Sequence, residues 1–206
     1  LLARSISFHF MEHGIYERRR NRAEADYIAE LVRHLLKQSG RMSIGVIAFS
    51  EAQQDEINGA LEHLAQEDHA FRNRLEAELE REEDGQFVGL LVKNLENIQG
   101  DERDIIIVST VYGRDQETNT VYQRFTGVNS VYGHRRLNVL FSRAKRRLIL
   151  VTSLRATDVR LTERQNRGVR IFREYLEYAA TGRLESGDIG GGAPDSDFEI
   201  MVAEAL

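Results

Sequence analysis

The chain has 206 residues, of which 41% are hydrophobic and 30% charged, so it is an ordinary globular protein with room for one α/β domain and a tail. No apolar run approaches the roughly 20 residues that cross a bilayer, which excludes a membrane-spanning helix. The net charge of -5 excludes nucleic-acid binding by bulk positive charge, and the absence of cysteine excludes disulfides and thiolate metal sites.

The start of the chain and its composition also suggest a context. The first ten residues lack the basic start and the small-residue cleavage site of a secretory signal, so we expect Leu1 to lie inside a longer protein. A chain without cysteine fits a reducing compartment, and we expect a cytoplasmic protein without a membrane anchor.

The first part of the chain predicts two strand–helix pairs. Residues 6–10 alternate between apolar and polar side chains, which predicts a half-buried strand. Asn21 and Glu24 have the spacing of a capping pair at the start of a helix. Residues 44–49 form a continuous apolar run, typical of a parallel strand covered on both faces, and Ser50 and Gln53 mark the start of a second helix.

The remaining chain continues this alternation. Residues 66–84 are amphipathic and very acidic, and we interpret them as a helical insertion; strands are predicted at 87–92 and 105–108 and an irregular segment at 113–134. A helix follows, with an apolar face made by Leu137, Leu140, Phe141 and Ala144. A strand at 148–151 and a helix at 168–180 complete an α/β fold with a parallel sheet flanked by helices.

The domain boundaries follow from composition. Residues 1–184 are expected to form one domain. Residues 185–197 contain four glycines and the single proline of the chain, which is a linker composition. We expect residues 198–206 to begin a helical segment that continues beyond them.

Three segments contain the candidate functional residues. The first, residues 44–53, is a buried strand that leads into a capped helix and places Ser50 at the carboxyl edge of the sheet, where open α/β sheets bind ligands. In the second, residues 96–104 (ENIQGDERD), Gly100 lets backbone amides approach a ligand and Glu102 offers an acceptor for ribose hydroxyls. Each segment, taken alone, also fits an ordinary turn or strand–helix junction.

The third segment, residues 135–145 (RRLNVLFSRAK), carries the strongest signal. If it is one helix that buries its leucines, Arg136 and Arg143 share the opposite face. Two guanidinium groups so placed can pair with the oxygens of a polyphosphate. The alternative is a basic surface helix.

In order and spacing, these three segments resemble motifs IV, V and VI of superfamily 1B helicases, the group that includes the RNA-surveillance helicases of nonsense-mediated decay. The third segment is similar to the Arg-Arg-Leu-Asn-Val-Ala-Leu-Thr-Arg-Ala-Arg motif VI of that group. The resemblance covers roughly residues 6–180. It implies a RecA-like P-loop NTPase fold and, specifically, the second lobe of the helicase motor.

The resemblance also implies roles for individual residues. Arg143 matches the catalytic arginine finger that reaches the γ-phosphate of ATP. The implied ATP-binding residues are Gln99 and Gly100 beside the γ-phosphate, Glu102 at the ribose and Arg136 as a supporting contact. The implied contacts to single-stranded DNA or RNA are Ser50, Lys93 and Asn97.

The chain has no Gly-x-x-x-x-Gly-Lys-Ser/Thr loop to hold phosphates. We therefore expect ATP and Mg²⁺ to be held mainly by a first RecA-like lobe of the same polypeptide, and this chain alone to be an inactive part of an ATP-dependent helicase. No metal site is expected in this chain, because residues 9–13 (HFMEH) fit an inverted zinc-protease pattern only on a helix, and their alternation predicts a strand.

Two alternatives remain open. The chain could be a RecA-like scaffold that binds nucleic acid or protein without catalysis. It could also be the adaptor of a nuclease, because residues 195–199 (DSDFE) resemble the opening helix of the Vsr-like endonuclease domain found at the C-terminus of some bacterial helicases.

Overall fold

A computed structural model describes residues 5–38, 42–98 and 100–183. Gln99, the linker expected at 185–197 and the segment expected at 198–206 lie outside the described residues. Within them, five strands form one fully parallel sheet in the order β1-β7-β6-β2-β5. Their bounds are β1 Ile6–Phe10, β2 Ile44–Ala48, β5 Leu91–Asn94, β6 Arg103–Ser109 and β7 Ala144–Thr152.

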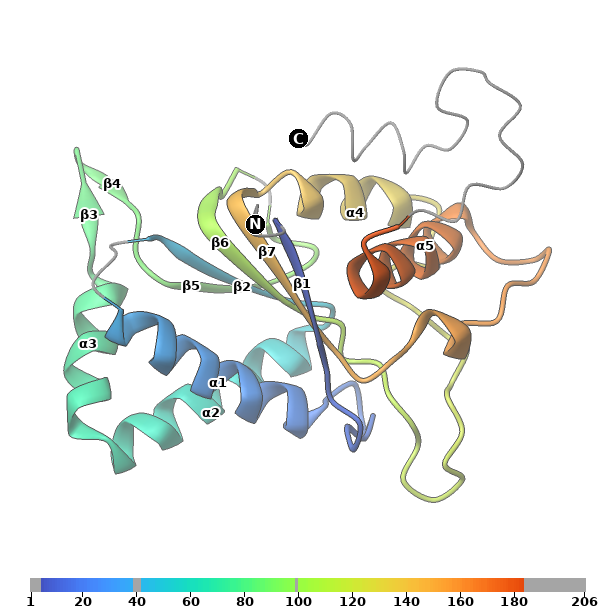
Figure 1. The fold of residues 1–206 in the computed structure, drawn as a ribbon, viewed down its shortest axis with the longest axis horizontal. Helices are drawn as coiled ribbons and strands as arrows, with labels where there is room; N and C mark the ends of the chain where they lie inside the picture. Colours follow the sequence, from blue (N-terminus) through green and yellow to red (C-terminus); the bar gives the residue numbers. More distant parts are fainter. Residues whose placement is uncertain (1–4, 39–41, 99, 184–206) are drawn as a thin grey trace.

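Helices cover both faces of this sheet (Figure 1). One face carries α1 Arg22–Lys37, α2 Glu51–Glu67 and α3 His69–Leu79, and the other carries α4 Gly133–Phe141 and α5 Arg167–Thr181. A short 3-10 helix, η1 Ala156–Asp158, precedes α5. This arrangement confirms the expected α/β fold of the RecA-like type, with a parallel sheet flanked by helices.

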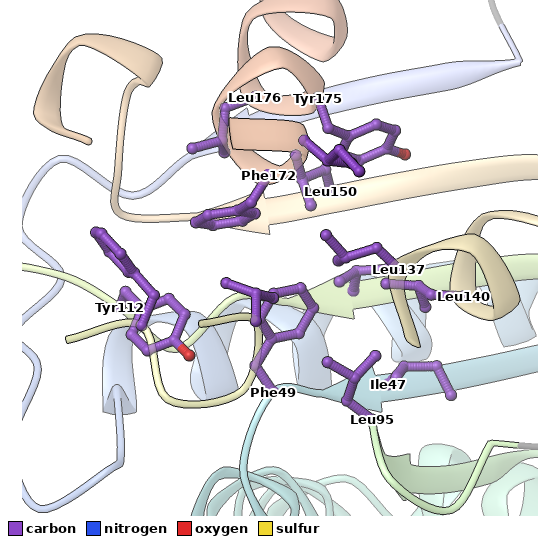
Figure 2. Packing of buried hydrophobic residues seen from close by; sticks show 14 of the residues in the cluster. Ile47, Phe49, Leu95, Tyr112, Leu137, Leu140, Leu150, Phe172, Tyr175 and Leu176 are labelled. Atoms are coloured by element: carbon purple, nitrogen blue, oxygen red, sulfur yellow. The ribbon is translucent and has the colours of Figure 1, made fainter. Parts of the chain in front are cut away.

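Two hydrophobic cores sandwich the sheet because neighbouring strand residues point to opposite faces. In β2, Val46 packs under α1 and α2, whereas Ile47 faces α4 and α5. Figure 2 shows the second of these cores, in which Phe172 of α5 and Leu137 of α4 lie over the sheet. A strand that is buried on both faces must be apolar throughout, which explains the continuous run at 44–49.

The helix starts that the sequence predicts are confirmed. Asn21 caps α1 by accepting a hydrogen bond from the Glu24 amide (3.3 Å), and Ser50 caps α2 by accepting one from the Gln53 amide (3.1 Å). The final helix buries Val169, Phe172, Leu176 and Ala179, which are the residues that its periodicity selects.

The acidic segment 66–84 spans the end of α2, all of α3 and the start of a two-stranded hairpin, β3 Glu82–Glu83 with β4 Gln86–Phe87. Phe71 and Leu75 of α3 are buried in the same core as α1 and α2. The segment is therefore packed onto the domain. That it is an insertion remains a prediction.

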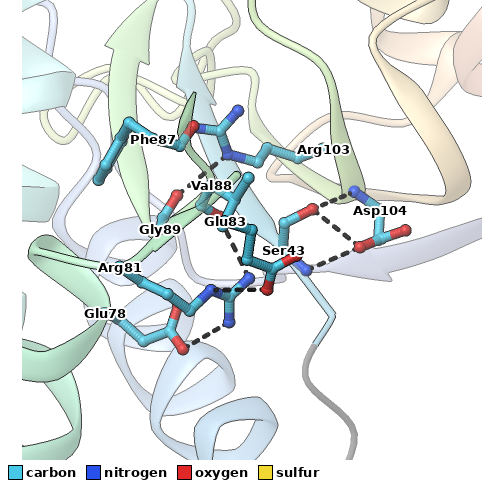
Figure 3. A network of polar contacts seen from close by, with 9 residues as sticks. All are labelled: Ser43, Glu78, Arg81, Glu83, Phe87, Val88, Gly89, Arg103 and Asp104. Carbon is cyan, nitrogen blue, oxygen red and sulfur yellow. Dashed lines mark hydrogen bonds and ion pairs between the residues drawn. The ribbon is translucent and has the colours of Figure 1, made fainter. Parts of the chain in front are cut away.

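One strand prediction is wrong in part. Residues 87–92 are not one strand, because Phe87 ends the hairpin and the sheet strand β5 begins only at Leu91. Between them the chain bends at Gly89, where an added Cβ would lie 1.8 Å from the Glu78 carbonyl oxygen. The buried guanidinium of Arg103 holds this bend by donating to the carbonyls of Gly89 (3.0 Å) and Phe87 (3.3 Å) (Figure 3).

The segment 113–134 is irregular, as expected, up to the start of α4 at Gly133, with isolated bridges that join Arg114 to Ile15 and to Val121. Among residues 5–38, 42–98 and 100–183, no helix is long and apolar enough to cross a membrane.

Candidate functional site

The starts of β6 and β7 bring three candidate residues together. Gly100 and Glu102 lead into β6, and Arg143 immediately precedes β7. The two strands are neighbours and parallel, so both start at the amino edge of the sheet, where the Arg103 amide donates to the Arg143 carbonyl (3.0 Å). The Arg143 Nη1 atom lies 3.8 Å from the Glu102 Oε1 atom. The structure thus pairs residues from the second and third segments.

Arg143 does not lie on a helix, which corrects the expected geometry. Helix α4 ends at Phe141, and Ala144 is already the first residue of β7. At this junction the Arg143 amide still donates to the Leu140 carbonyl (3.1 Å), and the Arg143 carbonyl begins the pairing of β7 with β6. Arg136 and Arg143 therefore do not share one helix face.

The Arg143 side chain is held against the end of α4. Its Nε atom donates to the Val139 carbonyl (3.0 Å) and its Nη2 atom to the Ser142 hydroxyl (3.1 Å). The side chain is 19% exposed, whereas that of its partner Glu102 is 51% exposed. Exposed ion pairs contribute little to stability, so a stronger anion can replace this carboxylate at small cost.

Arg136 has a different neighbourhood. It forms an ion pair with Glu96 (3.2 Å) and donates to the Gly127 carbonyl (3.5 Å). Glu96 lies in the crossing segment between the carboxyl end of β5 and the amino end of β6, in which Leu95 and Ile98 are buried in the core. Arg136 thus fixes α4 to this crossing segment.

The backbone at Gly100 has a φ of +91°, a conformation that residues with a Cβ rarely adopt. An added Cβ would meet no atom within 4 Å. The glycine is therefore needed for its backbone conformation, and the space around it is open. Its neighbour Gln99 lies outside the described residues, so its role stays a prediction.

Ser50 lies at the other end of the sheet. It follows β2 at the carboxyl edge, as predicted, and is 6% exposed. Its hydroxyl donates to the Arg19 carbonyl (2.6 Å) and accepts from the Gln53 amide (3.1 Å). Because both bonds are internal, Ser50 serves to position the arginine-rich connection between β1 and α1.

The two remaining candidates differ in how accessible they are. Lys93 of β5 forms an ion pair with Asp101 (2.5 Å) in the segment that leads to β6. The Asn97 side chain is exposed and has no hydrogen-bond partner among the described residues. Of the three residues predicted to contact nucleic acid, Asn97 alone thus presents free polar atoms.

The carboxyl edge also contains a buried polar network that the sequence did not predict. The Glu24 carboxylate accepts from the hydroxyls of Ser109 (2.6 Å) and Ser153 (2.9 Å) and from the Val111 amide (2.9 Å). The Asn21 side-chain amide donates to the same carboxylate (3.2 Å). Glu24 is fully buried, and burial raises its pKa from 4.5 to about 7.

Gln53 connects this network to α2. Its side chain accepts from the Asn21 amide (2.6 Å) and donates to the Asn21 carbonyl (2.9 Å) and to the Ser109 hydroxyl (3.1 Å). The network therefore joins α1, α2, β6 and the end of β7. A signal was present in the sequence: Glu24 lies on the helix face of Ile28 and Val32, so a buried carboxylate was foreseeable.

His9 lies on a strand, as the alternation predicted. His9 is within β1, and its Nδ1 atom lies 2.7 Å from the Tyr27 hydroxyl. Within the described ranges, no group of three or more His, Asp or Glu side chains is arranged to hold a metal ion.

The geometry of the amino edge suits an anionic ligand. Besides Arg143, the exposed side chains of Lys145, Arg146 and Arg147 lie at the start of β7, and Arg146 is paired with Asp104 (3.1 Å). The amino edge and the arginine-rich connection between β1 and α1 lie at opposite ends of the sheet (Figure 1).

Comparisons with known proteins agree with this description. A family model described as AAA domain (AAA_12) matches residues 6–155. The chain is 34% identical over 205 residues to a Mycoplasma pneumoniae protein named uncharacterized ATP-dependent helicase MG140 homolog, with 94% of this chain covered. It is 35% identical over 182 residues to the uncharacterized ATP-dependent helicase MG140 of Mycoplasma genitalium, with 87% covered. The chain spans 17% and 15% of the length of these relatives.

Proposed function

Because the chain belongs to the AAA-domain family, we propose that it is the C-terminal motor lobe of an ATP-dependent superfamily 1B DNA or RNA helicase. In this proposal, a first RecA-like lobe of the same polypeptide holds ATP and Mg²⁺, and this chain completes the ATP site and contacts a single strand. The names of the two relatives support the helicase class.

The observation that carries the proposal is the pairing of Glu102 with Arg143 at the amino edge. A planar guanidinium that is always charged and partly desolvated is suited to phosphate oxygens. The Arg143 guanidinium is held by the exposed Glu102 carboxylate, the Val139 carbonyl and the Ser142 hydroxyl. A phosphate oxygen can replace each of these partners.

The residues at this edge fit the phosphate side of ATP. Gly100 exposes its backbone without a side chain, Arg143 provides a fixed positive charge, and the start of β7 adds exposed basic side chains. Glu102, released from Arg143, is an acceptor for ribose hydroxyls. When bound, ATP supplies the phosphoanhydride bond whose cleavage drives the motor.

Arg143 changes its partner during this mechanism. In the open state it is paired with Glu102 and with the end of α4. When the lobes close, it leaves Glu102 and stabilises negative charge on the terminal phosphate, which in related nucleotide hydrolases accelerates turnover about 10³- to 10⁵-fold. Arg136 keeps α4 against the crossing segment and thereby fixes the end of α4, which Arg143 follows.

On the strand side, Asn97 is the proposed direct contact, Ser50 acts by positioning its neighbours, and Lys93 contacts phosphate if it separates from Asp101. Contacts to backbone phosphates make binding tolerant of sequence and sensitive to salt.

The test is ATP turnover of the full-length protein, with and without single-stranded DNA or RNA, in the wild type and in Arg143→Ala. Strand-stimulated turnover should fall at least about a hundredfold while binding of a fluorescent ATP analogue persists. Arg170→Ala, which removes an exposed arginine from α5, is the matched control and should keep turnover. Unchanged turnover in Arg143→Ala would refute the proposal and favour the non-catalytic scaffold.

A further inference from the structure

The connection between β1 and α1 contains a tight turn made by Arg18 and Arg19. The amide and carbonyl of Glu17 pair with those of Arg20 at 2.8 and 2.9 Å, which closes a two-residue loop. Arg18 has a φ of +48° and Arg19 a φ of +66°. Turns with two positive φ values strongly prefer Asn-Gly, so two arginines here adopt an unfavourable backbone conformation.

Hydrogen bonds on both sides hold this turn in place. Ser50, buried at the start of α2, donates its hydroxyl to the Arg19 carbonyl (2.6 Å). Asn21, which is fully buried, follows the turn; its amide donates to the Gln53 side chain and its carbonyl accepts from it. Before the turn, the Tyr16 amide donates to the Arg114 carbonyl (2.9 Å). These hydrogen bonds therefore fix the backbone of the turn.

The side chains of the turn point into solvent. The Arg18 side chain is 89% exposed and forms an ion pair with the exposed Glu17 (3.8 Å). Arg19 is exposed and has no carboxylate partner among the described residues. Strained backbone conformations cluster at functional sites, and this one presents two exposed cations.

A cavity of about 570 Å³ adjoins the turn, and its charged lining residues are Arg18, Arg20, Arg22, Glu17, Asp26 and Glu56. The acids beside them are already paired, Glu56 with Arg20 (3.6 Å) and Asp26 with Arg22 (3.5 Å). The Arg22–Asp26 pair is exposed and the Arg20–Glu56 pair partly exposed, so both are weak and phosphate groups can replace the carboxylates.

We propose that the Arg18–Arg19 turn is a binding site for the phosphodiester backbone of a single nucleic-acid strand, at the carboxyl edge of the sheet. The inference rests on the proposed function, because it assigns the strand of that motor to a particular element. Ser50 is then a positioning residue that holds the turn, and the arginines make the contacts.

The turn offers a variant that separates charge from structure. Arg18→Asn with Arg19→Gly removes both guanidinium groups and installs the sequence that this turn geometry prefers. The double variant should therefore fold, with an equal or higher Tm, and bind strand more weakly. A second double variant, Arg18→Lys with Arg19→Lys, keeps the charges and should retain most of the affinity.

The measurement is fluorescence anisotropy of the full-length protein with labelled oligothymidylate and oligouridylate of about 20 nucleotides, over a series of salt concentrations. The Asn-Gly variant should bind roughly tenfold more weakly, and its plot of log K against log salt should be shallower by about 1.4, the value for two lost phosphate contacts. Turnover without strand should stay unchanged. The control is Arg72→Gln with Arg74→Gln on α3, which removes the same number of positive charges as the Asn-Gly variant. It should bind like the wild type.

Each outcome decides between the two proposals. If the Asn-Gly variant binds like the wild type and has the same salt dependence, the turn is not a strand site, whereas the motor proposal stands. If the wild type binds neither oligonucleotide, the turn proposal also fails; the absence of ATP turnover as well would refute the motor proposal.

Discussion

The two edges of the sheet are built in opposite ways. At the amino edge, Arg143 and Glu102 meet in a partly exposed ion pair next to a glycine with open space around it. At the carboxyl edge, Glu24 and its partners form a buried network, and the arginines beyond it are exposed. The amino edge can therefore exchange the ion-pair partner of Arg143, whereas the carboxyl edge fixes the backbone of the Arg18–Arg19 turn and exposes its side chains.

Alanine at two glycines tests this difference most strongly. A Cβ on Gly14 would lie 1.9 Å from the Ser153 hydroxyl and 3.0 Å from the Asn21 side-chain amide, so Gly14→Ala must displace the buried network. We expect it to lower the free energy of unfolding by about 3 kcal/mol. The Cβ that Gly100→Ala adds would meet no atom, so only the positive φ of the backbone opposes this substitution. We expect it to lower the free energy of unfolding by about 1–2 kcal/mol. Urea denaturation of the chain measures both, and equal losses would contradict the comparison.

The pH dependence of stability tests the buried edge. Because the folded pKa of Glu24 is about 7 and its ordinary value is 4.5, the folded chain holds this proton more tightly than the unfolded chain. Its stabilising contribution is complete below about pH 4.5 and is lost as the pH rises through 7. From about pH 5 to about pH 8, the free energy of unfolding should fall by about 2 kcal/mol.

The matched variant for this test is Glu24→Gln, which should remove most of that slope. Burial lowers the pKa of His9, so this group contributes a slope of opposite sign that is present in both proteins and cancels in their difference. Parallel pH profiles for the two proteins would show that Glu24 does not titrate in this range.

Substitution of Glu102 tests whether Arg143 exchanges partners at the amino edge. If Glu102 binds the ribose once Arg143 has left it, Glu102→Ala should raise the KM for ATP about fivefold, the value of about one hydrogen bond, with little change in kcat. Steady-state kinetics of the full-length protein separates the two parameters. A KM that stays constant or falls would mean that Glu102 serves only to hold Arg143 in the open state.

The sequence predicted most of the fold because apolar periodicity determines which faces are buried. The strand at 44–49 and the helix at 168–180 were found this way, since β2 is buried throughout and α5 buries one face. The start of β7 was missed because residues 144–147 are mostly basic and exposed, and this hid both the early end of α4 and the position of Arg143 outside it.

The candidate site was predictable only where it depends on order along the chain. The segments at 96–104 and 135–145 were identified by their residues, and the parallel sheet brings their ends together at the amino edge. The network of Glu24, Ser109 and Ser153 depends on contacts between residues far apart in sequence. Local patterns identified Glu24 as a capping residue, and they could not reveal which strands end beside it.

The most direct test is a comparison of Arg143→Ala with the Arg18→Asn, Arg19→Gly double variant in one experiment on the full-length protein, with strand affinity and strand-free ATP turnover measured for both. The account predicts opposite losses: the first variant loses turnover and keeps strand affinity, and the second loses strand affinity and keeps turnover. If each variant lost both properties, or if neither lost any, the assignment of separate ligands to the two edges of the sheet would be wrong.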